Sequence, residues 1–172
     1  MNRVIMTVIA CLIMGACANA PYPATSGENM RILVMGEDHS DGTFSRKSRV
    51  FLAVKSGISE SLREAGYEVK DEELITLDNF VQGRNYRTKS ELVDIARSVG
   101  TPIDGVVIFR LYGLVETKKY MKRVRPRILI TGVMTKGGNV LPEAHTYLSP
   151  KIIPHGCKGG CLGEYFVEEA KD

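Results

Sequence analysis

The sequence has few of the features that identify enzymes, nucleic-acid-binding proteins and integral membrane proteins. It contains no G-x-S-x-G motif, no phosphate-binding glycine loop and no H-E-x-x-H motif. Its formal net charge is only +3, which makes nucleic acid a poor candidate partner. It shows no internal repeat, no low-complexity tract and no apolar run of the roughly 20 residues that a membrane-spanning helix needs. These absences favour a small globular domain without an evident catalytic centre.

The amino-terminal end carries a short apolar run instead. Residues 4–14, "VIMTVIACLIM", are uncharged and follow Arg3, a pattern typical of a secretory signal. Two cleavage sites compete behind this run. The A-x-A sequence at residues 18–20 would leave Pro21 as the first residue, whereas "MGAC" at residues 14–17 resembles the bacterial lipobox, with Met14 in place of the usual Leu. We expect residues 1–16 to be a lipoprotein signal peptide and Cys17 to be diacylated, with a plain cleaved signal as the alternative.

The lipobox determines where the rest of the chain would lie. Two or more acyl chains on Cys17 would anchor the protein stably to a membrane. Ala18 follows that cysteine, and the lack of Asp there resembles lipoproteins sorted to the outer membrane. Residues 17–30 are rich in Pro, Ala, Ser and Gly and are expected to be a flexible tether. Residues 31–172 would then form one domain that faces the periplasm. The mature chain from Cys17 would carry a net charge of +2, because loss of the signal peptide removes Arg3 from the +3 of the whole chain.

Hydrophobic periodicity in this region alternates between that of strands and that of helices. Strands are expected at residues 31–37, within 67–77, and at 104–116, 124–134 and 140–148. Helices are expected from Val50 to Gly66, from a capping box at Thr88–Glu91 to Gly100, and at residues 162–170. Pro126 indicates either an edge strand or a strand that begins later. The order β-α-β-α-β-β-β-α predicts a single α/β domain with a mixed sheet and helices packed on it.

Several of these segments resemble a known family. The segments are "RILVMGE", "LREAGYEVKDEEL", "ELVDIARSVGTPIDGVVIFRLYG" and "RILITGVMTKGGNVLPEAH". They are similar to the periplasmic α/β domain shared by the TolB amino-terminal domain, the curli-secretion lipoproteins, the lipoprotein activators of penicillin-binding proteins and some flagellar assembly proteins. The resemblance covers residues 31–149. The chain lacks the long amphipathic insertions of the curli-type pores, which argues against a secretion channel.

The resemblance implies a non-enzymatic, membrane-anchored accessory lipoprotein that acts through protein–protein contacts in wall synthesis, secretion or motility. No cofactor or metal is expected. The alternative is a small envelope metal-binding protein or enzyme that uses Asp38, His39 and Asp41, which follow Glu37 at the end of the first strand. Asp, Ser and Gly are also the ordinary residues of turns and helix caps, which favours a structural role for this loop.

A dense basic run is the strongest surface feature. It comprises Lys118, Lys119, Lys122, Arg123, Arg125 and Arg127. Such a run could bind an acidic envelope protein, anionic lipid or peptidoglycan carboxylates, or it could be a solvated strand connection kept soluble by its charges. If Arg125 and Arg127 lie on an edge strand, a partner strand would add there. The pattern also leaves a homo-oligomer open.

The segment "PHGCKGGC" contains the remaining cysteine pair, Cys157 and Cys161. Export would place both thiols in an oxidising compartment, where pairs become disulfides. Even with His155 the segment offers fewer than the four ligands of a structural zinc site, and it is not the C-x-x-C of redox enzymes. We therefore predict an intramolecular disulfide that fixes the closing helix.

Overall fold

The computed structural model describes residues 30–38, 44–75, 86–158 and 160–171. The elements follow in the order β1 (Arg31–Glu37), α2 (Arg49–Glu64), β2 (Glu68–Asp71), the 3₁₀ helix η1 (Glu72–Leu74), α3 (Lys89–Ser98), β3 (Gly105–Thr117), β4 (Met121–Met134), β5 (Val140–Tyr147), β6 (Lys151–Pro154), α4 (Gly160–Glu164) and α5 (Val167–Lys171). The predicted α/β domain with a mixed sheet is confirmed. Two details differ: β6 was not expected, and the closing helix is divided into α4 and α5.

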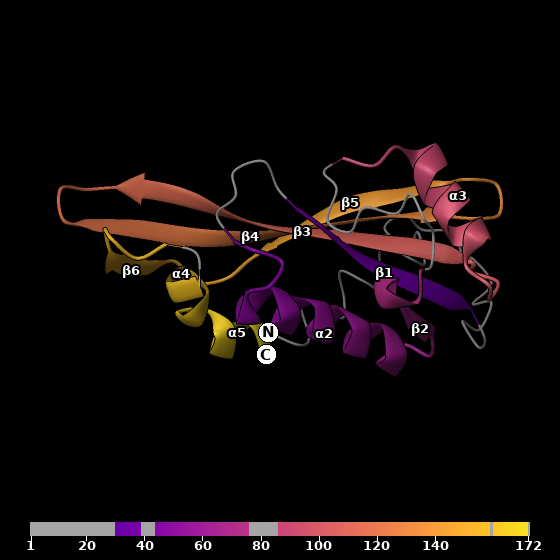
Figure 1. Ribbon diagram of the computed structural model, residues 1–172, viewed down its shortest axis with the longest axis horizontal. Coiled ribbons are helices and arrows are strands. Elements are labelled where there is room, and N and C mark those ends of the chain that lie inside the picture. Colours follow the sequence, from indigo (N-terminus) through magenta and orange to yellow (C-terminus); the bar gives the residue numbers. More distant parts are fainter. Residues whose placement is uncertain (1–29, 39–43, 76–85, 159, 172) are drawn as a thin grey trace, which may run out of the picture.

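The sheet has the order β2-β1-β3-β4-β5, and β6 pairs with β4 beside the end of β5. β1 runs parallel to β2 and β3, whereas β3, β4, β5 and β6 pair in antiparallel fashion. β3 and β4 form one long hairpin, paired from Gly105↔Met134 to Thr117↔Lys122. β1 ends where Glu37 pairs with Arg110, so the remainder of the hairpin extends past the parallel part of the sheet (Figure 1).

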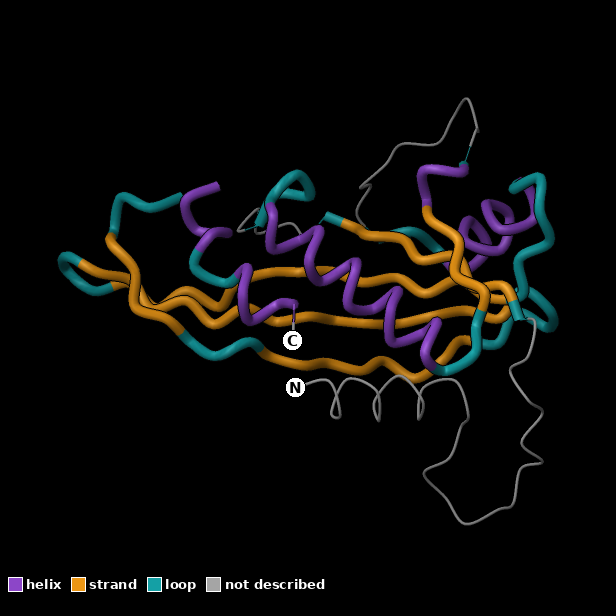
Figure 2. The backbone as a smooth tube through the Cα atoms, turned by 90° about the horizontal axis from the view of Figure 1, so that it is seen from below, coloured by secondary structure: helices purple, strands orange, loops and turns teal. Residues whose placement is uncertain are grey.

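Helices cover both faces of the sheet. α2, α4 and α5 pack on one face, as Figure 2 shows, and α3 packs on the other face against β3 and β4 (Figure 1). Alternating side chains of the strands fill the two cores. Val107, Phe109 and Leu111 of β3 belong to the α2 side, whereas Val106 and Ile108 belong to the α3 side. No helix in the described ranges is both long and apolar enough to cross a membrane.

The helix signals in the sequence are confirmed at the ends of α2 and α3. Thr88 and Glu91 form the reciprocal capping box of α3. α2 is followed by Gly66, whose φ of 91° lies in the left-handed region that favours glycine after a helix. The apolar stripe of α2 is buried as its spacing predicts, and this fixes α2 against β1 and β3.

Pro126 corrects the expectation of an edge strand or a later start. It lies in the interior of β4, opposite Gly113 of β3. β6 pairs with β4 up to Val124 and β5 pairs with it from Arg127, so Pro126 lies at the junction of the two partners. The Pro126 carbonyl accepts a hydrogen bond from the Leu148 N–H at 3.1 Å. Because the nitrogen and the carbonyl of one residue in an antiparallel strand point to the same side, the Pro126 nitrogen also faces the side of β5 and β6, and neither strand pairs with β4 at this position. The missing N–H therefore costs the sheet no ladder bond.

Candidate functional site

The basic run occupies the free end of the β3–β4 hairpin. Lys118 and Lys119 lie in the exposed turn, and the strand alternation divides the other four side chains. Arg123, Arg125 and Arg127 lie on the face opposite α2, whereas Lys122 lies on the other face and donates from Nζ to the Cys157 carbonyl. Lys122 is thus engaged in holding the chain after β6, and only part of the run is available to a partner.

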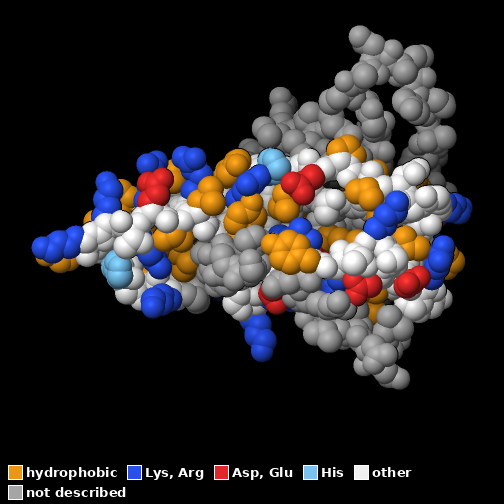
Figure 3. Space-filling view, turned by 90° about the horizontal axis from the view of Figure 1, so that it is seen from above, with side chains coloured by type: hydrophobic (Ala, Val, Ile, Leu, Met, Phe, Trp, Pro, Cys, Tyr) orange, Lys and Arg blue, Asp and Glu red, His pale blue; other side chains and the backbone are white. Residues whose placement is uncertain are grey.

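The three arginines form the central column of a surface that we call the hairpin face. It consists of the outward side chains of neighbouring strands: Tyr112, Leu114, Glu116, Arg123, Arg125, Arg127, Tyr147 and Ile152. Arg125 pairs with Leu114, and Arg123 lies between Glu116 and Ile152. Leu114 is 47% exposed and Ile152 is 62% exposed, which is unusual for large aliphatic side chains on a sheet. Figure 3 shows Lys and Arg side chains gathered over this end of the molecule, with hydrophobic side chains between them.

Arg127 is held between two aromatic rings. Its guanidinium carbon lies 5.7 Å from the centre of the Tyr112 ring and 5.5 Å from that of Tyr147. These are cation–π distances, and they restrict the side chain to the surface of the sheet. Partial burial raises the pKa of the Tyr112 phenol, although the positive charge of Arg127 opposes this shift. Tyr112 therefore stays neutral and keeps its stacked position at physiological pH.

Glu37, at the start of the predicted acidic loop, is part of the core. Its side chain is fully buried, and its Oε2 accepts from Nε and Nη2 of Arg110 at 2.8 and 2.6 Å. Its Oε1 accepts from the Arg87 N–H at 3.2 Å, with Nη1 of Arg87 at 3.6 Å, and the ring of Tyr86 lies over Arg110. Sequence reasoning missed Arg87 and Arg110. The one usable signal was a charged residue, Arg110, in an otherwise apolar strand.

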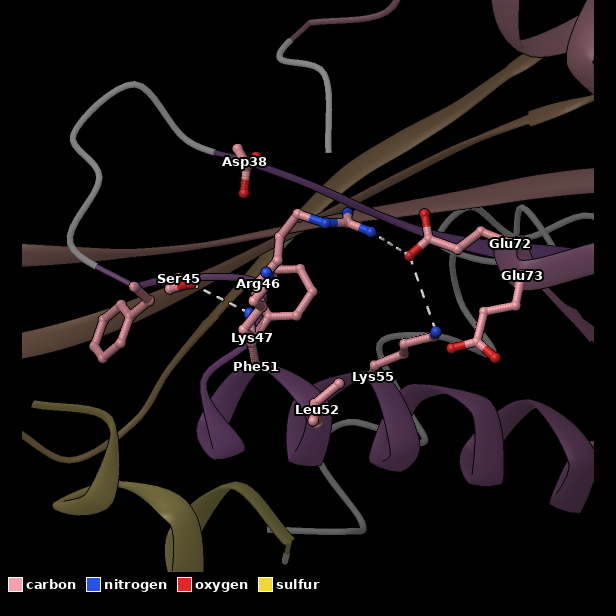
Figure 4. A pocket seen from close by; sticks show the side chains of 10 residues that line it. Asp38, Ser45, Arg46, Lys47, Phe51, Leu52, Lys55, Glu72 and Glu73 are labelled. Atoms are coloured by element: carbon pink, nitrogen blue, oxygen red, sulfur yellow. Dashed lines mark hydrogen bonds and ion pairs between the residues drawn. The ribbon is translucent and has the colours of Figure 1, made fainter. Parts of the chain in front are cut away.

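The rest of the acidic loop is described only at Asp38, because His39 and Asp41 lie outside the described residues. Asp38 borders a cavity of about 670 Å³ between the end of β1, the start of α2 and η1 (Figure 4). Charged side chains in and beside the cavity pair with each other: Arg46 with Glu72 at 2.7 Å and Lys55 with Asp71 at 2.7 Å. Within the described ranges, the second carboxylate oxygen of Glu72 is buried and has no hydrogen-bond partner.

Metal-ligating residues do not gather in the described part of the chain. It contains no group of three or more His, Cys, Asp or Glu side chains placed to hold an ion. The cavity instead combines carboxylates with Arg46, Lys47 and Lys55, as Figure 4 shows. The three carboxylates that line the cavity are thus matched by three positive charges, a mixture that differs from the cluster of anionic oxygen ligands preferred by Ca²⁺ and Mg²⁺.

Cys157 and Cys161 are joined by a disulfide in the structure, with their Cα atoms 5.5 Å apart. The linked segment leads into α4, and the buried Leu162 and Phe166 follow it. Phe166 packs edge-on against Phe44 with ring centres 5.9 Å apart. The disulfide therefore lies between β6, which borders the hairpin, and the helices that pack beside α2.

Comparisons with known proteins address the fold. No family model matches the chain, and a search of curated proteins finds no match. Among solved structures, the chain is similar to the LpoB C-terminal domain from Salmonella enterica, with a TM-score of 0.53, 12% identity, and coverage of 84% of this chain and 95% of that chain.

Two further solved structures extend this comparison. The NMR structure of Escherichia coli LpoB gives a TM-score of 0.53 at 13% identity, with coverage of 86% and 66%. Lipoprotein GNA1162 from Neisseria meningitidis gives a TM-score of 0.46 at 16% identity, with coverage of 81% and 94%. At these identities the likeness to LpoB concerns the fold alone, which is one found in bacterial envelope lipoproteins.

Proposed function

We propose that this chain is a non-enzymatic accessory lipoprotein of the bacterial envelope. Acyl chains on Cys17 hold it at the outer membrane, and the domain reaches a protein partner in the periplasm. The lipobox at residues 14–17 and the fold shared with LpoB support this proposal. The group that the sequence resembles includes lipoprotein activators of penicillin-binding proteins. Wall synthesis is therefore the first machinery to test, ahead of secretion and motility.

The observation that carries the proposal is the projecting hairpin. β3 and β4 continue past the end of β1, and large apolar side chains on this extension are exposed to solvent. Packing of the hydrophobic core does not require such an extension. Here Leu114, Tyr120, Met121 and Ile152 are exposed at the same end as the arginines. Arginine and aromatic residues beside aliphatic ones are the composition of the central part of protein interfaces. The hairpin face is accordingly the surface that we assign to the partner.

Site-specific photo-crosslinking in the native envelope tests this assignment. A photoreactive residue at Leu114 or Ile152 should give a discrete crosslinked product with another envelope protein, which mass spectrometry would identify. Leu52 of α2 is the matched control, because it is 53% exposed and lies on a helix of the opposite face. Equal products from Leu52, or none from either hairpin position, would contradict the proposed docking face.

A further inference from the structure

We propose that the hairpin face recognises an acidic segment of the partner protein that lies along the column of Arg123, Arg125 and Arg127. This inference rests on the proposed partner-binding function and specifies the chemistry of the partner. It is argued only from the exposed side chains of the hairpin face. It therefore applies whether the partner protein belongs to wall synthesis, secretion or motility.

The spacing of the column matches the spacing of carboxylates on an extended chain. Side chains on one face of a strand repeat every second residue, at about 6.8 Å for a rise of about 3.4 Å per residue. Arg123, Arg125 and Arg127 therefore present positive charges over roughly 14 Å. A segment with Glu or Asp at every second position presents its carboxylates with the same period. Each guanidinium can then receive one carboxylate, with the two-pronged geometry that arginine favours.

The charges of the column are largely unopposed within the protein. Glu116 lies directly across from Arg123 in the β3–β4 ladder. Arg125 instead pairs with Leu114, an aliphatic residue. Arg123 and Arg125 are both exposed, and among the described residues neither makes an ion pair. An acidic partner would supply the missing counter-charges.

The residues that flank the column favour a protein over a lipid surface. Arg127 lies between the rings of Tyr112 and Tyr147. The exposed Leu114 lies beside Arg125, and the exposed Ile152 lies beside Arg123. Arginine and tyrosine are both enriched at interface hot spots, and the contacts of Arg127 with the two rings order one of the three arginines in advance. A membrane would first meet the turn, where Lys119 lies over the ring of Tyr120, which is 73% exposed. The arginines lie on one face of β4 and not in the turn itself.

Binding of labelled peptides to the purified domain with its intact disulfide tests the proposal. The probe is a fluorescent peptide with Glu at alternate positions and small residues between them, and the control probe carries Gln at the same positions. We expect the Glu peptide to bind measurably by fluorescence polarisation, the Gln peptide to bind at least about tenfold more weakly, and the affinity to fall with added salt. Equal binding of the two peptides would overturn the proposal.

Paired charge reversals locate the binding. R123E/R125E should weaken binding of the Glu peptide at least about tenfold, while Lys122 keeps its bond to the Cys157 carbonyl. R63E/R97E makes the same change of net charge at exposed positions of α2 and α3 and should alter affinity less than about twofold. A thermal melt of each variant confirms that it is folded. Equal loss in both variants would mean that net charge alone attracts the peptide, which would overturn the proposal.

Two further measurements test whether the hairpin face binds a lipid surface or a second copy of the chain instead. Vesicles of phosphatidylethanolamine and phosphatidylglycerol should not compete with the Glu peptide. If the vesicles bind through Arg123 and Arg125 and the peptide does not, the face binds lipid and the proposal fails. If light scattering shows that R123E/R125E abolishes self-association, a second copy of the chain is the occupant and the proposal also fails. Crosslinks from Leu114 together with failed peptide binding would retain the partner-binding function and reject only the acidic segment.

Discussion

The buried carboxylate of Glu37 illustrates how a residue of the apparent acidic loop serves the fold. It is the last residue of β1, pairs with Arg110 of β3, and accepts from Arg110 and Arg87 with no exposure to solvent. Removing one member of a buried ion cluster leaves the others desolvated and uncompensated. We expect Glu37→Gln to lower the free energy of unfolding by about 3 kcal/mol, measured by urea denaturation. Glu116→Gln, an exposed carboxylate of β3, should change it by less than about 0.5 kcal/mol. Similar values for the two variants would show that the cluster contributes nothing.

Gly36 is required for the close approach of β1 and α2. A Cβ at this position would lie 2.5 Å from Cζ of Phe51, a side chain that is itself packed against Phe109. Gly36→Ala should therefore cost about 1–3 kcal/mol through overpacking, which a thermal melt would register as a lower Tm. Gly100→Ala is the control, because nothing lies within 4 Å of a Cβ there. A Tm for Gly36→Ala as high as that of the control would contradict the packing argument.

At the scale of elements, the disulfide links β6 to the short helices that follow. α4 and α5 span only Gly160–Glu164 and Val167–Lys171, too short to be stable without tertiary contacts. The loop closed by Cys157 and Cys161 is small, so we expect C157S/C161S to lose roughly 1–2 kcal/mol of unfolding free energy. Urea denaturation without reductant measures this loss. Mass spectrometry of the non-reduced, alkylated native protein supplies the second test, and two alkylated thiols there would refute the predicted bond.

The elements that sequence reasoning located are those that carry their own local signal. α2 has apolar residues at helical spacing, β3 begins with an apolar run, and β4 alternates between buried and more exposed residues. The start of α3 is marked by a single pair of side chains, Thr88 and Glu91. β6 lacks such a signal, because it has four residues and only Ile153 is buried. The closing helix breaks near Phe166, since that ring must turn into the core beside Phe44. Tertiary packing decides both outcomes.

The candidate site was predictable in composition and not in geometry. Six basic residues within ten positions were evident, but their division between two faces depends on the register of β4. The tyrosines that hold Arg127 come from β3 and β5, and the register of the two ladders places both of them opposite it. The exposed Leu114 likewise acquires meaning from its position opposite Arg125. Neither relation is encoded in local spacing.

At the scale of the whole molecule, the anchor determines where the hairpin face can act. Cys17 lies outside the described residues, and its acylation remains a prediction from the lipobox. We expect the wild-type protein to partition into the detergent phase, because two or more acyl chains bind membranes stably. Cys17→Ser should accumulate as uncut precursor or be released as soluble protein after cleavage at Ala20. An unmodified native amino terminus at Pro21 would refute lipidation.

The connectivity of the sheet also bears on the order in which the domain folds. β3 and β4 meet through the turn at residues 118–120, whereas Glu37 and Arg110 of the β1–β3 ladder are 73 positions apart. Loop-closure entropy favours the nearer pairing, so we expect the hairpin to be formed in the transition state and β1 to join later. Val124→Ala should then mainly slow refolding, and Val34→Ala, equally buried, should mainly speed unfolding in stopped-flow experiments. The reverse pattern would contradict this order. The strands that carry the proposed recognition surface would thus be assembled before the parallel part of the sheet that supports them.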